Sequence, residues 1–132
     1  MILGVGVDQI EVERVRKQVE NTPGFRERIF AAGEIAYCES KRRSAEHYAA
    51  RWAAKEAFFK ALGTGWREGM EWPEVAVEND ELGKPSLKLT GKAAALAAEH
   101  GVSRAHVSLS HLKDVATAYV ILETDTDHTT TE

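Results

Sequence analysis

An alanine-rich stretch at residues 49–65, AARWAAKEAFFKALGTG, constrains the fold of this chain more than any other segment. Alanine, leucine and the straight-chain charged residues favour a helix, and nothing before Gly63 interrupts one. We expect this helix to run from about residue 47 to residue 62. Its small side chains would let a neighbouring element approach closely, and its aromatic side chains are typical of a buried position. The sequence therefore predicts a long central helix.

Charged side chains on this helix are the first candidates for function. Glu56 and Lys60 are four residues apart and share one face, and Arg51 and Lys55 form a second row with the same spacing. An exposed Glu–Lys pair would contribute only about 0.3–0.5 kcal/mol to stability. Gly63-Thr64-Gly65 follows the carbonyl end of the helix, so we interpret it as a cap and loop. A phosphate cradle would need the amide end.

The remaining pattern predicts one α+β domain over residues 1–123, with an antiparallel sheet packed against the central helix and flanking helices around it. We expect strands at 2–8, 75–79, 86–90, 104–111 and 116–123, and further helices at 11–20, 33–46 and 91–100. Two glycines share the Asp8 face of the first strand and leave room for something to approach. The polar tail, 124–132, is expected to be disordered.

The composition excludes several classes of protein. The net charge of −4 argues against general nucleic-acid binding, although an excess of basic residues among the first 60 would suit an acidic protein partner. The single cysteine, Cys38, excludes an internal disulfide framework and suits a reducing cytoplasm. The first residues do not resemble a signal peptide, and no apolar run is long enough to span a bilayer. We therefore expect a cytoplasmic protein with no membrane partner.

The isolated candidates for chemistry are Asp8, Arg51, Glu56, Lys60 and His111. Two carboxylates with few other ligands suit Mg²⁺, which commonly takes one or two carboxylates plus substrate phosphates. The basic side chains would suit a phosphate-bearing substrate. A zinc site is not expected, because the histidines lack ligand spacing. A triad of Ser110, His111 and Asp114 is disfavoured, because adjacent residues of a strand point to opposite faces.

Five segments of the sequence together resemble one known family. They are VGVDQIEVERV (5–15), FRERIF (25–30), ARWAAKEAFFKALGTG (50–65), GKP (83–85) and HVSLSH (106–111). In this order and spacing the chain resembles holo-acyl-carrier-protein synthase, the small trimeric bacterial type of the 4′-phosphopantetheinyl transferase superfamily. The resemblance implies Mg²⁺-dependent transfer of the 4′-phosphopantetheine arm of coenzyme A to a serine of apo-acyl carrier protein, in fatty acid biosynthesis. It also implies release of adenosine 3′,5′-bisphosphate, and a homotrimer with active sites between subunits.

The resemblance further implies residue roles. Asp8 and Glu56 match the Mg²⁺-binding carboxylates, Lys60 matches the lysine beside the pyrophosphate, and His111 matches the histidine near the nucleotide phosphates. Arg51 is also expected at a phosphate. The proton of the attacked serine would go either to Glu56 or to a metal-bound water. The turn beside the adenine of coenzyme A is expected to consist of Gly83, Lys84 and Pro85, and the residues that meet the carrier protein are expected to include Arg14 and Arg26.

Two positions depart from the family pattern. Gln9 replaces a usually apolar residue, and Leu112 stands where relatives often have a polar one. The alternative function is a catalytically silent module that binds coenzyme A or acyl carrier protein. The presence of Asp8, Glu56 and Lys60 together argues against it, because binding alone would not need a metal pair. The lack of a GxxxxGK[ST] loop excludes the commonest other Mg²⁺-dependent phosphoryl enzymes.

Overall fold

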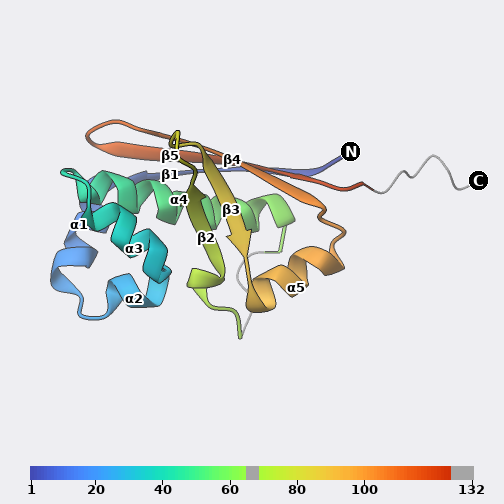
Figure 1. Ribbon diagram of the computed structural model, residues 1–132, viewed down its shortest axis with the longest axis horizontal. Coiled ribbons are helices and arrows are strands. Elements are labelled where there is room, and N and C mark those ends of the chain that lie inside the picture. Colours follow the sequence, from blue (N-terminus) through green and yellow to red (C-terminus); the bar gives the residue numbers. More distant parts are fainter. Residues whose placement is uncertain (65–68, 126–132) are drawn as a thin grey trace, which may run out of the picture.

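The computed structural model describes residues 1–64 and 69–125, and it confirms the α+β class (Figure 1). In chain order the elements are β1 (Ile2–Glu11), α1 (Val12–Asn21), α2 (Phe25–Ile29), α3 (Ala32–Glu39), α4 (Ser44–Leu62), the 3-10 helix η1 (Trp72–Glu74), β2 (Val75–Asn79), β3 (Pro85–Leu89), α5 (Gly91–Glu99), β4 (Arg104–His111) and β5 (Val115–Glu123). The helix expected over 33–46 ends early, at Glu39, because Ser40 turns its hydroxyl back to the carbonyl oxygen of Tyr37. Gly65 and most of the predicted tail lie outside the described residues.

Helix α4 lies along one face of a three-stranded antiparallel sheet with the strand order β1–β5–β4 (Figure 1). Two glycines of β1 show how close the helix comes. A Cβ atom on Gly6 would lie 2.0 Å from the carbonyl oxygen of Ala57, and one on Gly4 would lie 2.0 Å from that of Ala61. Glycines on the strand and alanines on the helix thus let backbone meet backbone. The element predicted to approach the glycine face is α4 itself.

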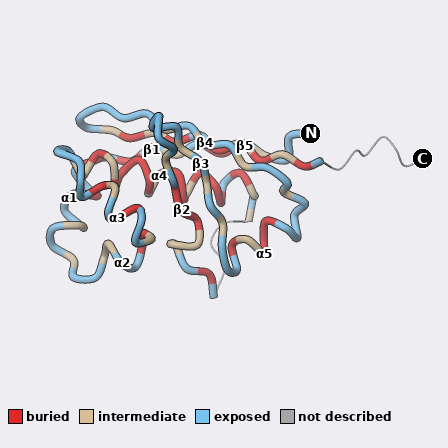
Figure 2. The backbone as a smooth tube through the Cα atoms, in the orientation of Figure 1, coloured by how far each residue is buried: buried red, intermediate tan, exposed pale blue. Residues whose placement is uncertain are grey.

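The β2–β3 hairpin forms a separate two-stranded sheet, with Asn79 paired to Pro85 beside the turn. Gly83 adopts φ +89° in this turn. A residue with a side chain rarely adopts that conformation, so the glycine at this position favours the turn. Strand β2 packs against α3 and α4, and α5 packs beside η1. Buried residues are concentrated along α4, as the red segments in Figure 2 show. The predicted burial of the central helix is confirmed.

The other face of the three-stranded sheet is apolar and exposed in the single chain. Leu3, Val5 and Val7 of β1 alternate with the glycines that face α4, and they point away from the helix. Tyr119 of β5, paired with Val7, is 52% exposed. An exposed apolar surface of this kind is typical of a site of association with another protein surface.

Lys55 and Glu34 form an ion pair inside the core. The Lys55 Nζ lies 2.7 Å from Glu34 Oε1, and it also donates to the carbonyl oxygen of Val75 at 2.5 Å. The second carboxylate oxygen of Glu34 accepts the backbone N–H of Val77 at 2.9 Å. Burial lowers the pKa of Lys55, and the Glu34 carboxylate opposes that shift. The first lysine of the KEAFFK segment is therefore structural.

Candidate active site

Asp8 and Lys60 meet where β1 runs alongside the C-terminal half of α4. Asp8 lies on the helix-facing side of the strand, in line with Gly4 and Gly6. The Lys60 Nζ donates to Asp8 Oδ1 at 2.8 Å and to the carbonyl oxygen of Val7 at 3.2 Å. The hydrogen bond with Asp8 is the largest reason that the pKa of Lys60 is raised. The close approach of helix and strand thus sets a cation beside a carboxylate.

Glu56 lies one turn before Lys60 on α4 and is partly buried. Burial raises the pKa of Glu56 and the Asp8 carboxylate raises it further, while Lys60 and Arg14 act in the opposite direction. A half-buried carboxyl group repelled by a second carboxylate is a favourable place for a cation. Within residues 1–64 and 69–125, no group of three or more His, Cys, Asp or Glu side chains could hold a metal ion. Asp8 and Glu56 influence each other electrostatically, and a pair of carboxylates would suit Mg²⁺ with phosphate and water as its other ligands.

His111 lies at the end of β4, beside the first turns of α4. Its Nδ1 is 2.9 Å from Glu46 Oε1, and its ring centre is 5.1 Å from that of His47. Glu46 precedes Glu56 by ten residues, which corresponds to about 15 Å along a helix. One chain therefore does not bring His111 together with the Asp8 cluster. Glu46 and His47 were not predicted as site residues from the sequence, because their only signal is their place at the start of α4.

Arg51, a residue of α4, is buried, with 2% of its surface exposed. Its guanidinium carbon lies 4.2 Å from the ring centre of Tyr37, and its Nη2 donates to Asn79 Oδ1. Asn79 in turn donates from Nδ2 to the carbonyl oxygen of Gly83 at 3.0 Å. Arg51 is thus connected to the turn that contains Gly83, Lys84 and Pro85. The phosphate contact of Arg51 stays a prediction.

The two arginines expected to meet a carrier protein differ in their surroundings. Arg14 is exposed on α1 and close enough to Glu56 to influence its pKa. Arg26 faces inward in part, with its Nε 3.3 Å from Glu39 Oε2. The neighbouring Arg16 is already paired with Glu13 and with Glu20, its Nη1 lying 3.1 Å from Glu20 Oε1. Of the α1 arginines, Arg14 therefore presents the more available charge.

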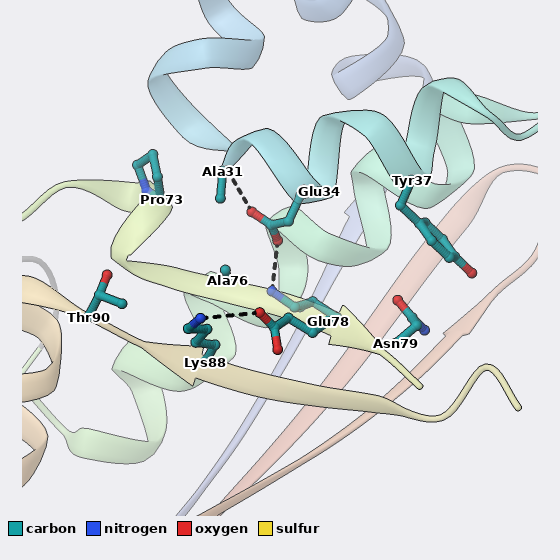
Figure 3. A pocket seen from close by; sticks show the side chains of 11 residues that line it. Ala31, Glu34, Tyr37, Pro73, Ala76, Glu78, Asn79, Lys88 and Thr90 are labelled. Carbon is teal, nitrogen blue, oxygen red and sulfur yellow. Dashed lines mark hydrogen bonds and ion pairs between the residues drawn. The ribbon is translucent and has the colours of Figure 1, made fainter. Parts of the chain in front are cut away.

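Hollows in the surface lie near several of these residues. A pocket of about 290 Å³ between α1, α2 and α4 has an apolar floor that includes Ile10 and Trp52, and Arg14 and Lys17 also line it. A pocket of about 450 Å³ between α3 and the β2–β3 hairpin has Tyr37 and Asn79 at one end (Figure 3). The lining of the larger pocket includes neither Asp8 nor Glu56 nor Lys60, so the candidate chemistry lies elsewhere.

Proteins of known family resemble this chain in both sequence and structure. A sequence profile of the 4′-phosphopantetheinyl transferase superfamily matches residues 4–120. The holo-[acyl-carrier-protein] synthase of Geobacter sulfurreducens is 53% identical over 125 residues, covering 93% of this chain and 98% of the relative. The crystal structure of the holo-[acyl-carrier-protein] synthase of Neisseria meningitidis superposes with a TM-score of 0.84 at 32% identity, over 94% of this chain and all of that one. That of the Bacillus anthracis enzyme, in complex with CoA (3′,5′-ADP), gives a TM-score of 0.78 at 35% identity, over 95% and 99% of the two chains.

Fold and site together define a 4′-phosphopantetheinyl transferase. The chain belongs to that superfamily and, within it, to the holo-[acyl-carrier-protein] synthase family, so the family predicted from the five sequence segments is confirmed. None of the helices in the described part of the chain combines the length and apolar character needed to cross a membrane.

Proposed function

We propose that this chain transfers the 4′-phosphopantetheine arm of coenzyme A to a serine of apo-acyl carrier protein and releases adenosine 3′,5′-bisphosphate. The observation that carries the proposal is the cluster of Asp8, Glu56 and Lys60 at the β1–α4 junction, in a chain of this family. Two carboxylates and an ammonium group are the side chains that displacement at a pyrophosphate needs. The coenzyme A present in the Bacillus anthracis relative supports the choice of donor.

Asp8 and Glu56 are the residues that would hold Mg²⁺. When bound there, the ion would neutralise charge on the pyrophosphate under attack. Lys60 is paired with Asp8 in the single chain, and its side chain is 55% exposed. The ammonium can therefore turn to the leaving bisphosphate without disturbing the core, while Glu56 is one of two candidates to accept the proton of the serine.

The coenzyme A site in this proposal is completed by a second copy of the chain. His111, Arg51 and the turn of Gly83, Lys84 and Pro85 would bind the nucleotide end from the neighbouring subunit. Support comes from the distance of about 15 Å along α4 between the His111 and Glu56 regions, and from the exposed apolar face formed by Val5, Val7 and Tyr119. A homotrimer, as the family resemblance implies, would cover that face. Arg42, Arg43 and Lys113 line a hollow together with Glu46, the partner of His111, and would add positive charge for phosphate.

Arg14 and Arg26 would receive the acidic carrier protein. The apolar hollow between α1, α2 and α4 offers a place for an apolar side chain of the carrier beside Arg14. Arg14 is close enough to Glu56 to lower its pKa. A carrier docked at Arg14 would therefore present its serine near the reacting phosphate. Charged docking of this kind raises the association rate and weakens with salt.

Mass spectrometry of apo-acyl carrier protein incubated with coenzyme A, Mg²⁺ and this protein tests the proposal directly. We expect the carrier to gain one phosphopantetheine group and EDTA to abolish the gain. No gain with several carrier proteins, despite binding of coenzyme A, would favour the silent binding module instead.

A further inference from the structure

We propose that Asn79 positions the coenzyme A-binding turn by joining it to Arg51, an inference that rests on the proposed function. Asn79 is the last residue of β2, and its side chain uses both of its polar atoms. The Oδ1 accepts from Arg51 Nη2, and the Nδ2 donates to the carbonyl oxygen of Gly83 at 3.0 Å. A guanidinium group only donates and a carbonyl only accepts, so these two partners fix the orientation of the amide. One asparagine thus connects helix α4 to the turn.

Arg51 is suited to be the fixed end of this connection. It is 2% exposed, and its guanidinium group lies over the ring of Tyr37. Figure 3 shows Tyr37 on α3 and Asn79 on β2 at the same end of the pocket between these elements. An arginine held between an aromatic ring and an amide, with its charge withdrawn from solvent, is a rigid anchor.

The turn is ordered internally by a different residue. Asp80 Oδ1 accepts the backbone N–H groups of Leu82 and Lys84, each at 2.9 Å. The backbone N–H of Asp80 also donates to the carbonyl oxygen of Lys84 at 3.0 Å. These bonds fix the shape of the turn but not its place relative to α4. The bond from Asn79 to Gly83 supplies that placement.

A turn that is already in place loses less conformational freedom when a ligand binds, so its affinity is higher. Removing one hydrogen bond of ordinary strength from such a connection is expected to weaken coenzyme A binding about three- to tenfold. Asn79 acts through Gly83 and does not touch the reacting atoms. It is therefore a positioning residue, and the turnover number should not change.

Asn79→Asp keeps one of the two hydrogen bonds and removes the other. A carboxylate still accepts from Arg51, but it has no N–H to donate to the carbonyl oxygen of Gly83. We expect the KM for coenzyme A to rise about three- to tenfold at unchanged kcat. Hydrogen–deuterium exchange over residues 80–85 should become faster, while exchange in α4 stays as in the wild type. Asn79→Ala, which adds no charge, should raise the KM at least as much. Glu78→Gln is the matched control: it alters only an exposed ion pair with Lys88 and should behave as the wild type.

Wild-type KM and wild-type exchange in Asn79→Asp and Asn79→Ala would overturn the proposal. A raised KM in Arg51→Lys alone, with both Asn79 variants normal, would also overturn it, since Arg51 would then act on the substrate directly. If the unaltered chain transfers no phosphopantetheine, the proposed function fails. The exchange measurement still decides whether Asn79 holds the turn.

Discussion

The ammonium nitrogen of Lys60 lies 2.8 Å from Oδ1 of Asp8, although 52 residues separate the two in the sequence. The contact exists because Gly4 and Gly6 let helix α4 lie directly on β1. Lys60 is more than half exposed and Asp8 is 12% exposed, so the lysine is the partner that is free to move. A carboxylate held in place and a mobile ammonium group can contribute separately to substrate binding and to turnover.

Lys60→Ala should reduce turnover more than substrate binding. If the ammonium stabilises the leaving bisphosphate, kcat falls about 100-fold or more, as for the loss of one charge-stabilising group in other enzymes. The KM for coenzyme A should change less than threefold by comparison. Steady-state kinetics by mass spectrometry of the carrier measures both. An unchanged kcat would instead make the contact with Asp8 purely structural.

Glu56→Gln should abolish Mg²⁺-dependent transfer while leaving the fold intact, because the amide keeps the shape but loses the charge that holds the ion. Mg²⁺ should raise the Tm of the wild type and leave the Tm of the variant unchanged. Calorimetric titration of Mg²⁺ into both proteins provides the direct comparison. Full activity and an unaltered metal response in the variant would contradict the metal assignment.

The same variant should be more stable than the wild type at neutral pH without metal. Folding raises the pKa of Glu56, by burial first and by the Asp8 carboxylate second, so the charged form destabilises the folded protein above the ordinary glutamate pKa of 4.5. The gain in Tm should therefore be present at pH 7. It should shrink as the pH falls through the raised pKa and vanish below 4.5. Thermal unfolding at a series of pH values measures it, and a gain that persists at low pH would point to another cause.

Mixing two inactive variants should restore activity if the site is shared between subunits. Glu56→Gln removes the metal side and His111→Ala removes the nucleotide side, so a mixed assembly contains interfaces at which both sides are intact. We expect co-refolded mixtures to recover a fraction of wild-type transfer, and refolded single variants to recover none. Failure of the mixture, with assembly verified by light scattering, would mean that each chain completes its own site.

Arg14→Glu should weaken the reaction through the carrier protein alone. The KM for the carrier should rise at least tenfold and depend less on salt, because an available positive charge is reversed. The KM for coenzyme A should not change. Arg16→Ala is the comparison, since Arg16 is already paired with Glu13 and Glu20 and should show a smaller effect.

Gly6→Ala should be strongly destabilising, because its Cβ would lie 2.0 Å from the carbonyl oxygen of Ala57, a backbone atom that cannot turn aside. We expect a loss of about 3 kcal/mol or more, at the upper end for overpacking. Gly33→Ala is the control: it lies on α3 with no atom near the added Cβ, and it should stabilise the protein by about 0.5–1 kcal/mol. Urea unfolding midpoints compare the two.

The sequence predicted the central helix, the strands and the family because local patterns and ordered segments carry that information. It could not predict which lysine of the KEAFFK segment is buried. Lys55 and Lys60 have the same helix propensity, and only the packing of α3 and β2 against one side of α4 separates them. Glu46 was missed for the same reason, because its pairing with His111 spans 65 residues and leaves no local signal.

The carboxylate of Glu34 belongs at once to three parts of the molecule. It accepts the backbone N–H of Ala31 at the start of α3, the ammonium group of Lys55 on α4, and the backbone N–H of Val77 on β2. Neither α3 nor α4 can open alone without leaving a buried charge unpaired, which is strongly unfavourable, and opening of β2 would remove a hydrogen bond from each partner of the ion pair. Helix α3, helix α4 and strand β2 should therefore exchange their amide hydrogens as one cooperative unit. Local fraying should stop at the residues that contact Glu34.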